Sequence, residues 1–187
     1  MASSEVEICN SALVKVGADR IISLSDDNER AQICNERYPK LRDDMLRSHP
    51  WNFALARVAL ADTGNTPEYD YTNEFQIPSD VLRIIGTDLY SDEIYKIEGK
   101  TLLANSSSVK IQYIKKITDV SYFDSNFAEA LSFRLAADIA YRISNSVNLT
   151  NQMYQLYLTV LRDARSMDAQ EGVPDRIVAD EWINSRF

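Results

Sequence analysis

The segment 47–53, with the sequence RSHPWNF, constrains the fold more than any other part of this chain. A long amphipathic pattern ends here and a β-rich pattern begins. Pro50 has no backbone N–H to donate and disfavours helix in the residue before it, so the helix must stop. Trp51 and Phe53 place large apolar side chains directly after the end of this helix. Pro50, Trp51 and Phe53 therefore predict a rigid junction that locks one structural module against another.

Apolar residues repeat at helical spacing in four stretches of the chain. The first helix is expected over 4–16, and the second runs from the acidic cluster at 25–27 to the break at Pro50. The second continues in phase across Pro39, which predicts a bend there rather than a stop. The third and fourth are expected at about 125–144 and 150–169. The third is apolar on most of its circumference, which predicts a central position.

The region between the second and third helices has β character. Apolar and polar residues alternate at Val109, Ile111 and Tyr113, and Glu98-Gly99 lies between two short extended segments as in a hairpin. The predicted fold class is α+β and mainly α, a four-helix bundle with a small antiparallel β module inserted between helices two and three. An extended C-terminal tail follows the bundle.

This organisation divides the chain into four parts. The predicted parts are the N-terminal half of the bundle (1–52), the inserted β module (53–117), the C-terminal half of the bundle (118–172) and a docking tail (173–187).

Two sets of side chains are candidate contact residues. Arg134, Asp138 and Arg142 follow at i, i+4 and i+8 on the third helix, so neighbours in this row can pair, and the row can set the register of a subunit interface. The tail is favoured as an arm that docks on a partner, although it can also fold back on its own bundle. Its candidate docking residues are Ile177, Val178, Trp182, Ile183 and Phe187.

Tyrosines form a further group, in which contact between chains and ordinary sheet packing are equally compatible with the sequence. These are Tyr69, Tyr71, Tyr90 and Tyr95 in the β module.

Composition excludes several classes of function. A net charge of −8 and a pI of about 4.7 oppose avid nucleic-acid binding, which needs clustered Lys and Arg. No apolar run is long enough to span a bilayer, and the N-terminal residues do not resemble a signal peptide, so we expect synthesis in a cytoplasm and no membrane partner. Cys9 and Cys34 fall on apolar helix faces and are expected to be buried thiols, without the further ligands that a metal site needs.

No arrangement of residues predicts catalysis. His49 is the single histidine, and its place at a helix end predicts a structural role, because the helix dipole favours a cation there. The acidic pairs Asp26-Asp27, Asp43-Asp44 and Asp92-Glu93 have the character of solvated surface or helix-start charges. We therefore predict no enzyme activity, no catalytic or metal-binding residue and no cofactor, with a carboxylate-dependent hydrolase as the catalytic alternative.

Several segments, read in order over about residues 5–170, resemble the tail tubular protein A family. The matching segments are EICNSAL at 7–13, Gly17-Ala18, ISLSDDNERA at 22–31, RSHPWNFA at 47–54, QIPSDVLRI at 76–84, IEG at 97–99 and EALSFRLAADIA at 129–140. The chain departs from the family pattern most at 62–68 and in the tail.

The resemblance implies a structural virion protein, because members of this family are head-to-tail adaptors of short-tailed bacteriophages (podoviruses). It implies a ring, expected to have 12 copies, that joins the portal protein to the tail nozzle protein below the portal vertex. Tail fibres are a further partner that the resemblance allows. Double-stranded DNA would pass through the central channel during ejection without specific binding. A transient assembly chaperone, made like the adaptor in the bacterial host cytoplasm, is the second alternative.

Overall fold

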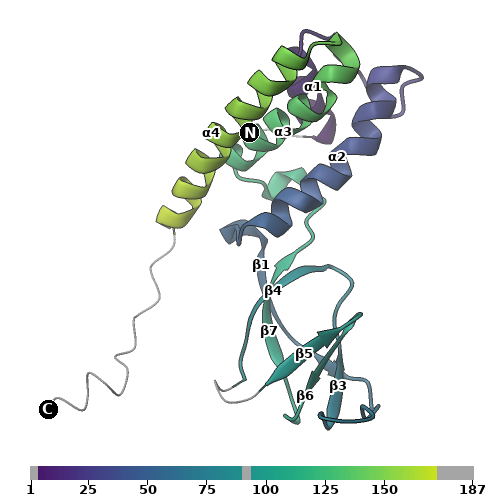
Figure 1. The fold of residues 1–187 in the computed structure, drawn as a ribbon, viewed down its shortest axis with the longest axis vertical. Helices are drawn as coiled ribbons and strands as arrows, with labels where there is room; N and C mark the ends of the chain where they lie inside the picture. The colour runs from purple at the N-terminus through teal and green to yellow at the C-terminus, as the bar shows by residue number, and fades with distance from the viewer. Residues whose placement is uncertain (1–3, 90–93, 172–187) are drawn as a thin grey trace, which may run out of the picture.

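The computed structural model describes residues 4–89 and 94–171 and separates them into a helical module and a β module (Figure 1). The helices are α1 (Glu5–Lys15), α2 (Glu29–Ser48), α3 (Ser125–Ser144) and α4 (Val147–Glu171). The strands are β1 (Leu55–Ala59), β2 (Ala61–Asp62), β3 (Asn73–Gln76), β4 (Val81–Thr87), β5 (Tyr95–Glu98), β6 (Thr101–Ala104) and β7 (Lys110–Lys115). Short 3-10 turns at Asn52–Ala54 and Val120–Tyr122 lie on the two connections between the modules.

Polar side chains cap the first three helices. Ser4, Asn28 and Asp124 each accept a hydrogen bond from a backbone N–H in the first turn of α1, α2 and α3. α2 continues through Pro39 without a stop, as the continuous apolar stripe predicts, and the expected bend there stays a prediction. It ends at Ser48, and His49 has the extended backbone expected of a residue before proline.

The central helix of the helical module is α3, as its wide apolar surface predicts. It packs against α1, α2 and α4, and its buried residues point in several directions. Lys15 helps to hold α1 on α3, because its ammonium donates to Ser132 Oγ at 2.9 Å and lies 3.0 Å from a carboxylate oxygen of Glu129. The same ammonium stands 4.5 Å from the centre of the Phe133 ring.

The β module consists of two antiparallel sheets. One has the strand order β1-β7-β4, and the other has the order β2-β3-β6-β5. The β5–β6 hairpin turns at Gly99, whose φ of 59° suits glycine, so the predicted hairpin is confirmed. The sheets enclose their own hydrophobic core, which includes Phe75, Leu102 and Ile111.

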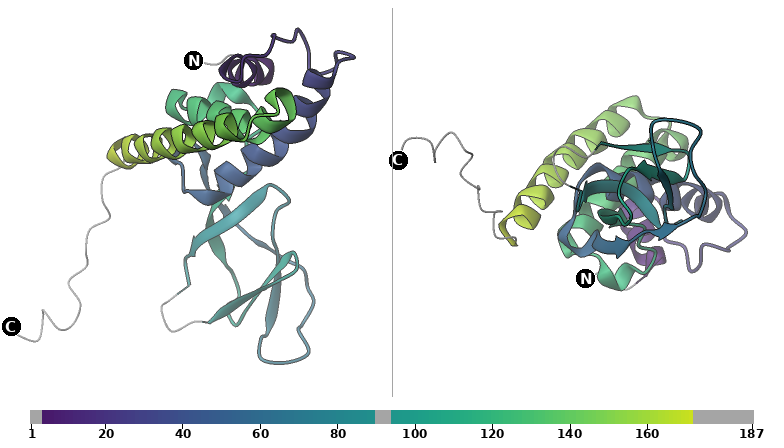
Figure 2. Two further views of the ribbon diagram at one scale, coloured as in Figure 1. Left: turned by 45° about the horizontal axis from the view of Figure 1, so that its top comes forward. Right: turned by 90° about the horizontal axis from the view of Figure 1, so that it is seen from below.

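The expected four-helix bundle with a small β insert is wrong. The helices do not line up around a shared axis: α4 packs extensively on α3 alone, and the left view of Figure 2 shows α1 end-on while α4 runs lengthwise. The β part is also no small insert, since among the described residues it has seven strands in two sheets and a separate core. Helical periodicity shows which face of a helix is buried, but it does not fix the angle at which two helices cross.

Candidate functional site at the junction of the two modules

Trp51 is the centre of the junction and is fully buried. Its ring lies 5.1 Å from Phe127 and 4.6 Å from His49, both edge-on, and stacks with Phe53 at 6.1 Å. Phe123 completes the cluster by contacting Phe53 and Phe127. Trp51 and Phe53, directly after Pro50, therefore pack into one aromatic cluster, and their role in locking two modules rigidly together stays a prediction.

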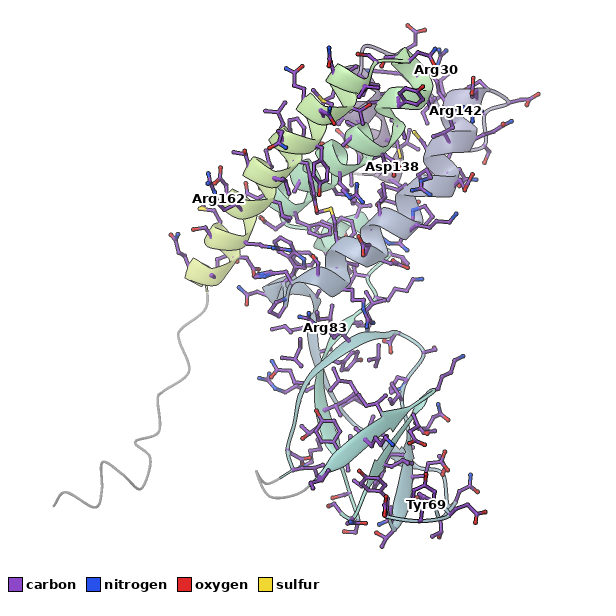
Figure 3. All side chains as sticks on the ribbon, in the orientation of Figure 1. Arg30, Tyr69, Arg83, Asp138, Arg142 and Arg162 are labelled. Atoms are coloured by element: carbon purple, nitrogen blue, oxygen red, sulfur yellow. The ribbon has the colours of Figure 1, made fainter. Side chains whose placement is uncertain are left out.

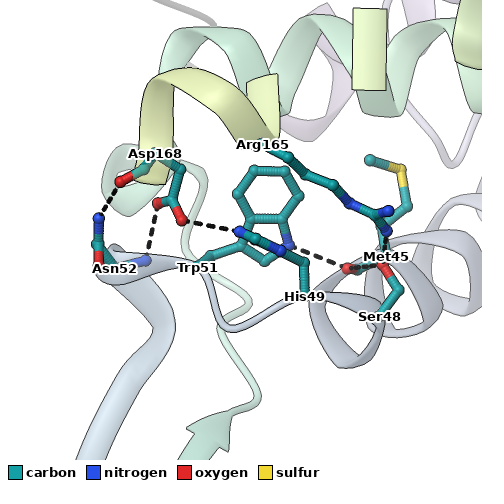
Figure 4. A network of polar contacts seen from close by, with 7 residues as sticks. All are labelled: Met45, Ser48, His49, Trp51, Asn52, Arg165 and Asp168. Atoms are coloured by element: carbon teal, nitrogen blue, oxygen red, sulfur yellow. Dashed lines mark hydrogen bonds and ion pairs between the residues drawn. The ribbon is translucent and has the colours of Figure 1, made fainter. Parts of the chain in front are cut away.

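Asp168, in the last turn of α4, links that helix to the same junction (Figure 4). Its Oδ2 lies 3.0 Å from Nε2 of His49, and its Oδ1 accepts the backbone N–H of Asn52 at 2.9 Å. The Asn52 side-chain amide also donates to the Asp168 backbone carbonyl. With the Asp168 carboxylate as the acceptor, Nε2 of His49 is the donor. The buried carboxylate thus fixes the end of α4 against the turn that begins the β module.

Further contacts strengthen this attachment on both sides. Trp51 Nε1 donates to the Met45 carbonyl at 3.0 Å, and the Arg165 guanidinium donates to Ser48 Oγ at 3.1 Å. On the β side, Lys116 Nζ pairs with Asp43 of α2 at 2.7 Å. An Arg47 N–H also donates to the backbone carbonyl of Leu82 at the start of β4. The two modules are therefore joined by covalent crossings, aromatic packing and polar contacts.

Asp168 and Asn52 are functional candidates that the sequence analysis missed. A signal for Asp168 is present, since Tyr157, Leu161, Ala164 and Asp168 follow one another at helical spacing on the buried face of α4. A carboxylate in phase with such a stripe must be paired when the helix packs. His49 lies at the helix end as predicted, but the group that faces it is a carboxylate rather than helix carbonyls alone.

The charge row on α3, of which Figure 3 labels Asp138 and Arg142, makes its contacts with other helices. Asp138 forms a two-pronged ion pair with Arg37 of α2, with N···O distances of 2.6 and 2.8 Å. Arg142 pairs with Glu29 of α2 at 2.8 Å, while Arg134 stacks over the Tyr157 ring at 5.6 Å. These side chains therefore hold α2 and α4 on α3, and their role at a subunit interface stays a prediction.

The remaining sequence candidates lie apart from the junction. Tyr69 is 75% exposed at the end of the β module furthest from the helices, and Tyr95 is also exposed. Tyr90 and the predicted docking residues of the tail lie outside the described residues. Contact between chains through these tyrosines stays a prediction.

The chemistry available at the junction is structural. Ser48, next to His49, donates its hydroxyl to the Met45 carbonyl and accepts from Arg165, so it is not aligned with the imidazole as a nucleophile.

Cys9 and Cys34 are buried, as predicted, and their mutual hydrogen bond together with burial raises the pKa of the Cys9 thiol. Within residues 4–89 and 94–171, no cluster of three or more His, Cys, Asp or Glu residues can hold a metal ion. No helix in the described part of the chain has the length and apolarity needed to cross a membrane.

Comparison with known proteins gives no match: no protein-family model fits the sequence, and no curated protein is significantly similar to it.

Proposed function

We propose that this protein is a head-to-tail adaptor of a short-tailed bacteriophage. In this proposal, copies form a ring, expected to be dodecameric, that joins the portal to the tail nozzle. Double-stranded DNA leaves through the channel in the ring. The sequence resemblance suggests this role, and the junction of the two modules supports it physically.

The observation that carries the proposal is the buried junction around Trp51 and Asp168. An adaptor contacts two different partners, and it holds both in place when its own parts are firmly joined. Here a helical module and a β module each have their own core, and Leu55, Leu82 and Ile114 of the β strands pack into the helical core. The Lys116–Asp43 ion pair also joins the two modules, while the Asp168–His49 contact ties α4 to the end of α2. Such a junction joins the two modules into one body with a helical end and a β end.

The acidic character of the chain is consistent with a channel for nucleic acid. A net charge of −8 repels phosphate and disfavours adhesion of DNA to the wall of the ring. The proposal assigns the C-terminal residues 173–187 to attachment at the portal, through the apolar residues named for that tail. The β module is then free to contact the nozzle.

Electron microscopy of purified particles tests the function directly. The proposal expects density for this chain as a ring beneath the portal vertex, at a stoichiometry that mass spectrometry of the same particles reproduces. Absence from finished particles after presence during assembly identifies a chaperone instead. Turnover of a glycoside or another substrate by the purified chain identifies a hydrolase. Either result overturns the adaptor proposal.

A further inference from the structure

The outer side of α4 carries no charge along most of its length. No Asp, Glu, Lys or Arg occurs between Arg142 at the end of α3 and Arg162 in α4, and no other stretch of the sequence without a charge is as long. The chain as a whole is 26% charged. Arg162, which ends the stretch, points away from the other helices (Figure 3).

Within the described fold, only a narrow stripe of α4 packs against other elements. Met153, Tyr157, Leu161 and Ala164 are buried, and α3 is the one helix against which α4 packs extensively. The residues beside the stripe are exposed and include large apolar side chains. We define the uncharged face of α4 as Asn151, Gln152, Tyr154, Gln155, Leu156 and Leu158, all of which are exposed.

Three large apolar side chains of α4 remain partly exposed beside its packed stripe. Tyr154, Leu156 and Leu158 keep 43%, 40% and 42% of their surface in water. The centres of protein interfaces are depleted in charged residues, and this face has none and includes the aromatic ring of Tyr154. α4 also forms an outer edge of the helical module, so a neighbouring molecule can reach this face (Figures 1 and 2).

We infer that the uncharged face of α4 is a contact surface for a second copy of this chain. The inference rests on the proposed ring and names one surface that would build it. Two copies with a net charge of −8 repel each other, and the repulsion is smallest where the approaching surface carries no charge. The asparagine and glutamine amides both donate and accept, so they can pair with any neutral or ion-paired surface of the neighbour.

Other kinds of partner fit this face less well. A nucleic acid needs cations opposite its phosphates, and the uncharged face offers none. A protein partner that is recognised by its charge needs opposite charges on the surface that it contacts, and this face has no charged residue. The chain's own residues 172–187 follow α4 in the sequence, but five of these sixteen residues are charged and would lose their hydration against this face.

Photocrosslinking of the full-length chain tests the contact. A benzophenone amino acid replaces Gln155 on the uncharged face, and a control chain carries it at Glu36, an exposed position on α2. The experiment is run on purified protein over a range of concentrations, with sedimentation as a parallel measure of assembly. The inference expects a covalent dimer of twice the chain mass from position 155, and at least tenfold less of it from position 36.

Charge insertion provides the second measurement. Leu156→Glu and Leu158→Glu together should raise the concentration needed for assembly at least tenfold, because each buries an unpaired carboxylate at the contact. Ile22→Glu, at a loop residue that is 93% exposed, is the matched control and should leave assembly unchanged. Circular dichroism verifies that all variants stay folded, since the altered positions are exposed.

The outcomes separate this inference from the proposed function. Wild-type assembly without a dimer from position 155 overturns the contact, as do crosslinks that map only within one chain and assembly that is unaffected by the two glutamates. A wild-type chain that stays monomeric at every concentration also overturns it. None of these results touches the adaptor role, which depends on the presence and symmetry of this chain in the particle.

Discussion

Replacement of Trp51 by alanine should destabilise the protein by about 3–5 kcal/mol. The side chain is fully buried between α2, α3 and the first turn of the β module, so its removal leaves a cavity bounded by Phe53 and Phe127. Most of this loss of stability comes from the lost packing of the indole ring. The Met45 carbonyl that accepts from the indole N–H also accepts from Ser48 Oγ at 2.8 Å, and it therefore keeps a partner in the variant.

Urea denaturation followed by circular dichroism measures the loss. Trp51→Phe keeps most of the ring packing and gives up one hydrogen bond, so it should cost about 1–2 kcal/mol. Tyr69→Ala removes an aromatic ring that is 75% exposed, and it should stay within about 0.5 kcal/mol of the wild type. A loss below about 1 kcal/mol for Trp51→Ala, with an unchanged slope of unfolding free energy against urea, would refute the idea that this residue holds the junction together.

Three further predictions address the junction, the core and the tail. Asp168→Ala should cost about 1–3 kcal/mol in urea denaturation because it leaves the Asn52 N–H without an acceptor, and Asp168→Asn should cost less; equal losses would show that the carboxyl oxygen is not the cause. Burial raises the pKa of Tyr38, so its phenol ionises more readily in the unfolded chain and the free energy of unfolding should fall as pH rises above about 10. Tyr38→Phe should flatten that fall, and an unchanged pH profile would contradict the assignment. Deletion of 173–187 should weaken attachment to the portal in a pull-down assay while the thermal unfolding transition persists; normal attachment would show that the tail is not the clasp.

Sequence reasoning located the elements well and their arrangement poorly. The predicted third helix has the observed bounds, and α2 ends where Pro50 requires it to end. The prediction of a four-helix bundle failed because four amphipathic stripes are compatible with many crossing angles. The β region was recognised, but its division into two sheets depends on pairings such as β1 with β7, which are far apart in the sequence.

The charge row on α3 illustrates the same limit. Spacing alone allows Arg134, Asp138 and Arg142 to pair along the helix, and an exposed pair of this kind gains little free energy. In the fold, Asp138 instead meets the planar guanidinium of Arg37, which lies 101 residues away in the chain and can use two N–H groups at once. A two-pronged contact in a partly buried position is stronger than an exposed one, so the long-range partner prevails.

The sequence by itself determined approximately where helices start and stop and which face of each helix is mainly apolar, since caps, proline and apolar periodicity act over a few neighbouring residues. Only the tertiary structure decided that Asp168 faces His49, which is 119 residues away in the sequence, and that the outer side of α4 is exposed. Such choices depend on which surfaces of different elements fit together, and that fit is a property of the packed chain rather than of any local segment.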